Sequence, residues 1–241
     1  MGFNSELANV TGRPWMVFDI ETIPMPGCAD YLPDDIEAPA NYKDPAKIAA
    51  YKDEKRQEQI ARAGLDLDLC EICAIGIAFP AGVAYAQTRA THSEADMLRG
   101  FWQFVRTLQK DGGNLVGFNC VSFDLPILLR RSLYLGIDTP AIALDKYRHE
   151  GVIDVLDVLT FNGRQKMRLL RFYAKRFGIS HDDSVNGDQI AALAAAGEWG
   201  KVEAHCRADV QTTTTLAARV GLIYQSQPEE VAAVLDAFGV A

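Results

Sequence analysis

The chain contains 241 residues, enough for one large domain with a well-buried core. Hydrophobic residues make up 49% and charged residues 23%, a globular composition that excludes wholesale disorder. The net charge of −8 argues against a protein that coats nucleic acid by bulk electrostatics. It does not exclude an enzyme that binds one strand end with the help of metal ions. No apolar run approaches the roughly 20 residues that span a bilayer. The first 14 residues show neither the basic start nor the apolar stretch of a secretory signal, so we expect none. We expect a cytoplasmic protein without membrane association.

The first predicted elements are strands separated by a charged insertion. Residues 14–21 (PWMVFDIE) form a short apolar run that ends in acids, which predicts a buried strand. A loop rich in Pro and Asp follows, and the alternating charges of residues 43–62 predict an exposed helix. We therefore expect a charged helical insertion over residues 24–68. Residues 72–88 (ICAIGIAFPAGVAYAQT) supply two further strands that turn at 80–82.

The rest of the chain alternates strands and helices and then becomes helical. Ser93 and Asp96 have the spacing of a capping box and predict a helix start. A strand over residues 114–119 leads to a second helix at Asp124. The remaining expected elements are a strand running into a helix at 152–161, an amphipathic helix that stops near Gly178, a long helix from about Lys201, and a closing helix over 228–239. This order predicts an α/β fold in which a mixed sheet is flanked by helices, in a single domain over residues 1–241.

Asp19 and Glu21 stand two positions apart at the carboxyl end of the first predicted strand. The period-two geometry of a strand places both side chains on one face. Two carboxylates on an otherwise apolar face repel each other and are costly to desolvate, so a hard divalent cation is an economical partner. The alternative is that the strand simply ends here and both acids are solvated.

Two further elements carry acids. Asp124 follows the strand that ends at Asn119, and either acts at a site or caps its helix. Asn119 either contacts a substrate or ties its own loop. His205 and Asp209 are four residues apart on the long predicted helix, so they lie on one helical face. An ordinary surface pair is the alternative interpretation of these two residues.

Taken together and in this order, the Asp-x-Glu strand, the Asn-x-x-x-Phe-Asp segment and the His-x-x-x-Asp helix resemble the DEDD (DnaQ-like) superfamily of 3′–5′ exonucleases, whose fold is RNase H-like. The closest resemblance is to the predicted 3′–5′ exonucleases related to the proofreading domain of B-family DNA polymerases. It is carried by SEADMLRGFWQF (93–104) and SVNGDQIAALAAAGEWGKVEAHCRADVQTT (184–213). The resemblance extends over most of the chain, from VFDIET to DVQTT.

The resemblance implies a metal-dependent exonuclease with a two-metal site. Its four carboxylates would hold two Mg²⁺ or Mn²⁺ ions, roughly 3.5–4 Å apart in enzymes of this kind. An all-oxygen ligand set favours these ions over zinc. The implied partner is the 3′ end of single-stranded DNA or RNA, with DNA favoured, and the product is a nucleoside 5′-monophosphate. The implied metal ligands are Asp19, Glu21, Asp124 and Asp209.

The implied general base departs from the superfamily pattern. The base is usually a Tyr four residues before the last Asp or a His five residues before it. Here His205 stands at the Tyr spacing, and Ala204 occupies the other position. A shift of one residue rotates a helical side chain by about 100°. Either a local adjustment brings His205 to the attacking water as general base, or catalysis relies mainly on the metals.

Substrate contacts are suggested by analogy and by local charge. Thr22 and Ile23 would meet the terminal nucleotide, and Phe123 either stacks on a base or fills the core. Between residues 161 and 180 the chain has no acidic residue but six basic ones, which either track a phosphate backbone or form a solvated helix face. These are Arg164, Lys166, Arg168, Arg171, Lys175 and Arg176.

Other functions are compatible with the same residues. The displaced histidine suits a catalytically weak nucleic-acid-binding module that keeps the exonuclease fold. An exoribonuclease and a two-metal phosphohydrolase for small nucleotides are further alternatives. The sequence assigns no polymerase or other protein partner.

Overall fold

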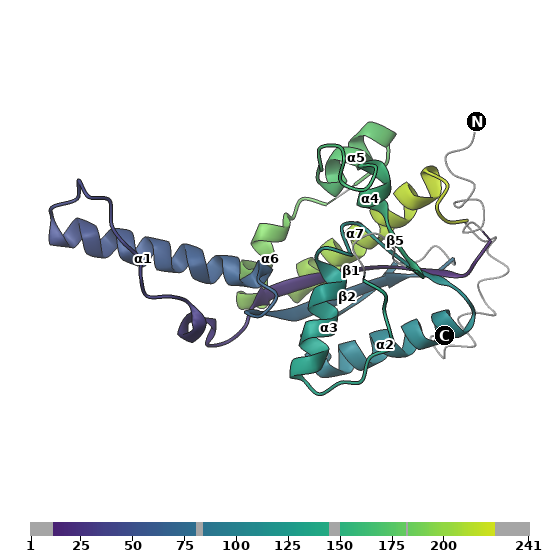
Figure 1. Cartoon of the computed structure of the whole chain (residues 1–241), viewed down its shortest axis with the longest axis horizontal. Helices are drawn as coiled ribbons and strands as arrows, with labels where there is room; N and C mark the ends of the chain where they lie inside the picture. Colours follow the sequence, from purple (N-terminus) through teal and green to yellow (C-terminus); the bar gives the residue numbers. More distant parts are fainter. Residues whose placement is uncertain (1–11, 81–83, 145–149, 182, 225–241) are drawn as a thin grey trace.

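A computed structural model of the chain describes residues 12–80, 84–144, 150–181 and 183–224. At its centre is a mixed sheet (Figure 1). The sheet has five strands in the order β3-β2-β1-β4-β5. The central strand β1 pairs antiparallel with β2 and parallel with β4, so the sheet is mixed around this strand. The strands are β1 (Trp15–Pro24), β2 (Cys70–Ala78), β3 (Ala84–Thr88), β4 (Asn114–Gly117) and β5 (Val152–Asp154).

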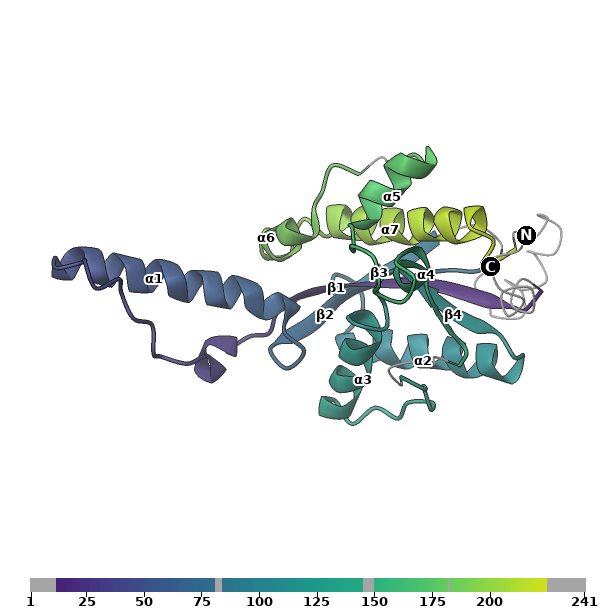
Figure 2. The same cartoon turned by 45° about the horizontal axis from the view of Figure 1, so that its top comes forward.

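Helices cover both faces of the sheet (Figure 2). One face is crossed by α7 (Trp199–Arg219), and the other is covered by α2 (Glu94–Lys110) and α3 (Asp124–Tyr134). The α7 side also carries α5 and α6, which contact α7. The shorter helices are α4 (Val155–Leu159), α5 (Leu170–Phe177) and α6 (Ile190–Ala195), with single 3₁₀ turns at Cys28–Tyr31, Ala63–Leu65 and Gly187–Gln189.

The alternation of side chains along β1 explains how the two helical layers are attached. Met16, Phe18 and Ile20 belong to the core cluster beneath α2 and α3. Trp15 and Val17 belong to the cluster beneath α7. Because successive strand residues point to opposite faces, the next odd-numbered positions of β1 also face α7. The sheet therefore presents the strand end that carries the two acids to this helix.

Between β1 and β2 the chain forms α1 (Pro45–Arg62), which extends away from the sheet as an arm (Figures 1 and 2). No residue of α1 is buried. The side chain of Asp44 caps the helix by accepting a hydrogen bond from the N–H of Ala46 at 2.9 Å. Arg56 ties the preceding loop to the helix through Asp34 and the carbonyl oxygen of Pro33. The exposed charged helix expected over residues 43–62 thus begins at Pro45 and ends at Arg62.

The predicted elements that lie within the described residues are observed in the expected order and type, and α6 is a further short helix that was not predicted. The long helix begins at Trp199, two residues before the expected start, and the capping interaction of Ser93 opens α2. The closing helix expected over residues 228–239 lies outside the described residues. Among the helices of the described part of the chain, none is long and apolar enough to cross a bilayer.

Candidate active site

Asp19 and Glu21 stand near the carboxyl end of β1. Both lie on β1 and project toward α7, and only 8% of Glu21 is exposed. Burial of Glu21 contradicts the alternative of a solvated strand end. The register between β1 and β2 shifts directly after Glu21, so a bulge interrupts the regular pairing beside the two acids before it resumes at Thr22.

Asp124 reaches the same strand from the opposite layer. Its Oδ1 accepts a hydrogen bond from the backbone N–H of Ile20 at 3.1 Å, although the two residues are far apart in the sequence. This N–H is accessible because β4 pairs with β1 only from Trp15 to Val17, which leaves the next part of that edge without a strand. The helix-cap alternative is wrong, because α3 already begins at Asp124 and its capping position is Phe123.

The long helix α7 brings Asp209 and His205 to the two acids of β1. Its close approach depends on Gly76 of β2, the residue paired with Asp19. A Cβ atom at Gly76 would lie 2.7 Å from Val210 Cγ2 and 2.8 Å from Cys206 Sγ. A glycine is therefore needed where α7 packs against the sheet beside Asp19.

Burial and mutual repulsion make the four acids one electrostatic group. Burial is the main cause that raises the pKa of Asp19 well above its usual range, and repulsion from Asp124, Glu21 and Asp209 adds to it. Glu21 behaves in the same way. Burial raises the pKa of Asp124 to about 7 despite its bond from Ile20. The pKa of Asp209 is raised by burial, although His205 and His181 lower it.

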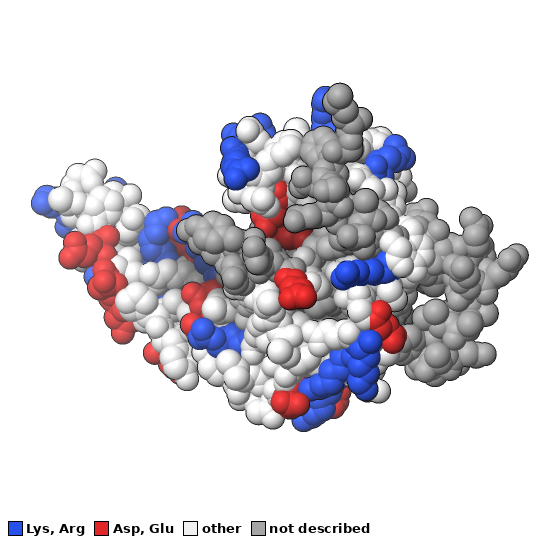
Figure 3. All heavy atoms as spheres, turned by 45° about the vertical axis from the view of Figure 1, so that its right-hand side comes forward, with Lys and Arg blue, Asp and Glu red and all other residues white. Residues whose placement is uncertain are grey.

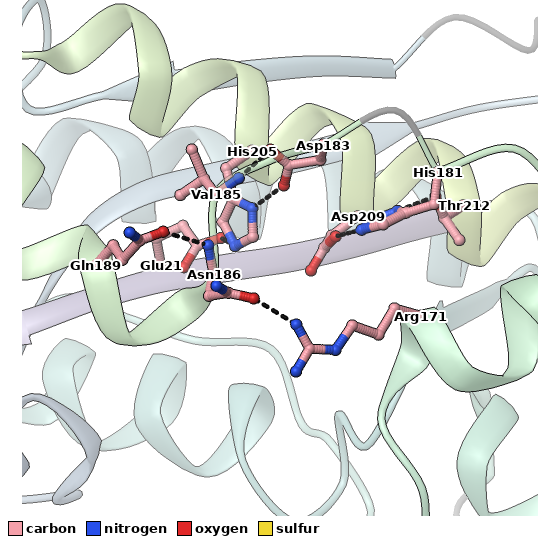
Figure 4. A network of polar contacts seen from close by, with 10 residues as sticks. All are labelled: Glu21, Arg171, His181, Asp183, Val185, Asn186, Gln189, His205, Asp209 and Thr212. Carbon is pink, nitrogen blue, oxygen red and sulfur yellow. Dashed lines mark hydrogen bonds and ion pairs between the residues drawn. The ribbon is translucent and has the colours of Figure 1, made fainter.

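Asp183, from the loop between α5 and α6, joins the site through His205 (Figure 4). Its Oδ2 is hydrogen-bonded to His205 Nδ1, and its Oδ1 accepts from the N–H of Val185 at 2.9 Å. The other ring nitrogen, His205 Nε2, lies 3.5 Å from Glu21 Oε1. His205 is only 5% exposed, so it is not part of a surface pair with Asp209.

His181, from the same loop, approaches Asp209. Its Nε2 lies 3.7 Å from Asp209 Oδ1, and its Nδ1 is 2.9 Å from the hydroxyl of Thr212. His181, Asp183 and Asp209 each offer a ligand atom within 4.8 Å of the others. Neither His181 nor Asp183 is among the residues predicted from the sequence. Both stand in an irregular loop, where neither strand nor helix periodicity indicates which way a side chain points.

The donor atoms of the site suit a hard divalent cation. Ligand atoms of Asp19, Glu21 and Cys206 lie within 4.8 Å of one another. Burial raises the pKa of the Cys206 thiol well above its usual range, which favours the neutral thiol, a poor ligand. The remaining donors are carboxylate oxygens, which Mg²⁺ and Mn²⁺ prefer. The residues present therefore fit the ions that the sequence implies.

The predicted substrate-contact residues occupy different environments. Thr22 donates its hydroxyl to the carbonyl oxygen of Gly64 at 2.5 Å, while Ile23 packs partly buried beside α6 and α7. Phe123 packs against the core beneath α2 and α3, which agrees with its core-filling alternative. Asn119 has a left-handed φ of 61°, and its backbone N–H donates to Asp154 Oδ1 at 2.8 Å. The loop-tying role of this position is thus carried by its backbone.

Comparison with known proteins supplies the family. Residues 65–231 match the model of a family described as predicted 3′–5′ exonucleases related to the exonuclease domain of PolB. The chain belongs to this family. No curated protein matches it significantly.

A solved structure agrees with the fold of this exonuclease family. The family B DNA polymerase from the hyperthermophilic archaeon Pyrobaculum calidifontis is similar over 91% of the chain, with a TM-score of 0.58 and 17% sequence identity. The chain spans about a quarter of the length of that polymerase, because the similarity covers 25% of it. The predicted RNase H-like arrangement of a mixed sheet flanked by helices is confirmed.

The family match and the geometry of the site contribute different residues. Asp124 and Asp209 lie inside the matched range, whereas Asp19 and Glu21 precede it. The structure joins the two sets, because Asp124 is bonded to β1 and Asp209 faces the same strand end from α7. All five residues expected to act in catalysis, the four acids and His205, are gathered in one place.

Proposed function

We propose that this protein is a metal-dependent 3′–5′ exonuclease that removes nucleoside 5′-monophosphates from the 3′ end of single-stranded nucleic acid, with DNA preferred. The observation that carries the proposal is the meeting of four acids from three distant chain segments. Glu21 and Asp124 are buried and Asp19 and Asp209 partly so, and burial together with repulsion among the acids raises the pKa values of Asp19 and Glu21. A cluster of this kind is unfavourable unless cations bind there.

The four acids would hold two Mg²⁺ or Mn²⁺ ions. Ions bound there supply an activated water for attack on the terminal phosphodiester and stabilise the leaving 3′ oxygen. Asp124 would keep its fixed position through the hydrogen bond from Ile20. Asp209 would be steadied by the nearby ring of His181. The site residues are Asp19, Glu21, Asp124 and Asp209.

For His205 the contacts favour a positioning role over that of general base. Each ring nitrogen faces a carboxylate, Asp183 on one side and Glu21 on the other. Outer hydrogen bonds of this type orient metal ligands and tune their basicity. In this role His205 fixes the orientation of Glu21. General base catalysis by His205 stays as the alternative, which a pH–rate profile of a His205 variant distinguishes.

The terminal nucleotide would bind where β1 continues beyond Glu21. Thr22 and Ile23 follow Glu21 directly, and the apolar side chain of Ile23 is only partly buried. Asn119 and Phe123 precede Asp124 in the neighbouring loop and are the second pair of proposed contacts, Phe123 through the part that the core leaves exposed.

The test uses a single-stranded oligonucleotide with a label at its 5′ end, incubated with Mn²⁺ or Mg²⁺. We expect a ladder of products shortened from the 3′ end, the release of 5′-mononucleotides, and no reaction in EDTA. Asp19→Asn and Asp209→Asn should reduce the rate by at least a thousandfold. Asp111→Asn is the control, because Asp111 is exposed at the end of α2.

Each alternative function gives a different result in the same assay. Full activity in Asp19→Asn, or in EDTA, would contradict the proposal. Tight binding without shortening would instead indicate a binding module, and faster degradation of RNA would indicate an exoribonuclease. Hydrolysis of nucleotide esters alone would indicate a phosphohydrolase for small nucleotides.

A further inference from the structure

One stretch of this acidic protein carries only positive charge. Residues 161–180 contain no Asp or Glu, and residues 161–169 are all exposed. In Figure 3, Lys and Arg side chains gather over the upper part of the molecule, where Figure 1 places α5, above a hollow in which acidic side chains are visible. We call residues 164–176 the basic segment. Its six basic residues are Arg164, Lys166, Arg168, Arg171, Lys175 and Arg176.

The charge of the basic segment is not compensated within the described part of the chain. None of its six basic residues forms an ion pair with a described acid, whereas basic residues elsewhere do, such as Arg56 with Asp34 and Arg106 with Asp138. An unpaired row of cations on the surface of a protein with a net charge of −8 attracts an anionic partner. The charge alone is consistent with any polyanion.

Exposed apolar side chains narrow the choice of polyanion. Met167 is 62% exposed, Leu169 63% and Phe172 43%, all within the basic segment. The guanidinium carbon of Arg168 lies 5.1 Å from the centre of the Phe172 ring. Aromatic and guanidinium surfaces interleaved with cations bind single-stranded nucleic acid, because unpaired bases stack on them while the phosphates meet the charges. A duplex keeps its base faces stacked inside and offers no such contact.

The basic segment is joined to the active site through Arg171. Its guanidinium is hydrogen-bonded to Asn186 Oδ1, and Figure 4 shows it reaching from α5 toward the loop that carries Asp183. Next to Asn186 in that loop, the N–H of Val185 donates to Asp183, which holds His205. Arg171 therefore links the basic segment to this loop; Phe172 follows it on α5, and Arg168 lies just before the helix begins at Leu170.

We infer that the basic segment is the binding track for the single strand upstream of its 3′-terminal nucleotide. Arg171 would contact the first phosphate behind the scissile one, and the pair of Arg168 and Phe172 would hold a following nucleotide. This inference rests on the proposed function and specifies its substrate as a single-stranded oligonucleotide of several nucleotides. Mononucleotide esters would lack every contact to the track.

The test compares two substrates in one enzyme. A 16-nucleotide single strand can occupy the track, whereas the 4-nitrophenyl ester of thymidine 5′-monophosphate contains one nucleotide. For the double variant Arg168→Gln, Phe172→Ala, we expect the ratio of the KM for the oligonucleotide to the KM for the ester to rise about tenfold. The matched control is Arg99→Gln, Arg106→Gln on the exposed side of α2, which should leave this ratio unchanged.

A binding measurement separates failure of the track from failure of the proposed function. The Kd of a fluorescent 16-nucleotide strand is measured by anisotropy in EDTA, with no turnover required. We expect the track variant to bind about tenfold more weakly than the wild type and to show a shallower dependence of log Kd on log salt, by about 0.7 for each lost phosphate contact. Equal weakening in the control variant, or no weakening in the track variant, would overturn the inference. The wild type could cleave neither substrate and still bind the strand more tightly than the track variant does. That result would overturn the proposed function and retain the track.

Discussion

His205 Nε2 lies 3.5 Å from Glu21 Oε1, while Nδ1 of the same ring is hydrogen-bonded to Asp183. A neutral imidazole carries one N–H, so it cannot donate to both carboxylates at once. Burial and repulsion from neighbouring acids raise the pKa of Glu21, which favours a protonated carboxyl facing the ring. In the positioning role proposed for His205, Asp183 orients Glu21 through this ring.

The first prediction concerns this chain of contacts. Asp183→Asn removes the charge that holds His205, so Glu21 loses its fixed orientation. We expect the affinity for Mn²⁺ to fall by about 10–100-fold, as measured by titration calorimetry. Asp188→Asn, at an exposed position of the same loop region, is the control and should bind Mn²⁺ like the wild type.

A different result would assign His205 to proton transfer. If Asp183→Asn and His205→Ala bind Mn²⁺ normally, lose turnover and lose the acidic limb of the pH–rate profile, then His205 acts as general base. A positioning role predicts that the Mn²⁺ affinity changes together with turnover.

The second prediction concerns stability without metal. The carboxyl pKa values of the site are raised in the folded state, that of Asp124 to about 7 from an ordinary 3.8. The folded state therefore prefers the protonated forms, and the stability they contribute is complete below about pH 4 and is lost as the pH rises through 7. Because this stabilisation is lost, we expect the Tm of the protein in EDTA to fall between pH 5 and pH 8. In Asp124→Asn the decrease in Tm over this pH range should be smaller.

Divalent cations should act in the opposite direction. They bind the ionised carboxylates, so the stabilisation they provide grows as the pH rises. At a concentration of about 100 Kd, binding contributes about 2.7 kcal/mol, which raises Tm by about 5–10 °C in a chain of this size. Scanning fluorimetry at pH 5 and pH 8 with and without Mn²⁺ measures both effects. A Tm in EDTA that rises up to pH 8 in the wild type but not in Asp124→Asn would contradict this electrostatic description.

Much of the site follows from the sequence because it stands on regular elements. The period of two places Asp19 and Glu21 on one face of β1, and the helical period places His205 and Asp209 on one face of α7. Local patterns do not give the distance between such faces. The ordered set of motifs predicted the fold. How closely the acidic face of β1 approaches that of α7 depends on the packing of α7 against β2 at Gly76, which the motifs do not show.

The residues that the sequence did not indicate lie where no period applies. His181 and Asp183 belong to an irregular loop, and their contacts with Asp209 and His205 depend on how that loop crosses α7. The bond from Ile20 to Asp124 likewise depends on where β4 stops pairing with β1, a tertiary property. Isolated Asp residues before helices are usually caps, so the local pattern at Asp124 pointed to the wrong role.

The third prediction tests the close packing at Gly76. In Gly76→Ala the added methyl group would overlap Val210 and Cys206 and push α7 away from β2. We expect a loss of about 1–3 kcal/mol in the free energy of unfolding, measured in urea. Mn²⁺ binding should weaken as well, because Asp209 moves with α7.

The control for this variant is another glycine. Gly100 lies within α2, and a Cβ atom there would meet nothing within 4 Å. Gly100→Ala should stabilise the protein slightly, by up to about 1 kcal/mol, because alanine favours a helix. Equal effects of the two substitutions would show that α7 does not require a glycine at position 76.

The fourth prediction concerns a buried ion pair that fixes α2 against α3 and β2. Glu94 accepts hydrogen bonds at 2.8 Å from Arg131 Nε, from Arg131 Nη2 and from the N–H of Ile72. Only 7% of the Glu94 side chain and 10% of the Arg131 side chain are exposed. Because Arg131→Met leaves a buried carboxylate without its partner, we expect it to lower the free energy of unfolding by about 3–5 kcal/mol.

Adding Glu94→Gln to Arg131→Met should recover part of that loss. The neutral amide oxygen can still accept from Ile72, and no uncompensated charge remains in the interior. Urea unfolding of the two single variants and the double variant completes a mutant cycle, with Arg99→Met at an exposed pair as the control. If Glu94 and Arg131 interact directly, the loss in the free energy of unfolding caused by each substitution depends on whether the other charge is still present. Strictly additive losses would therefore contradict a direct interaction.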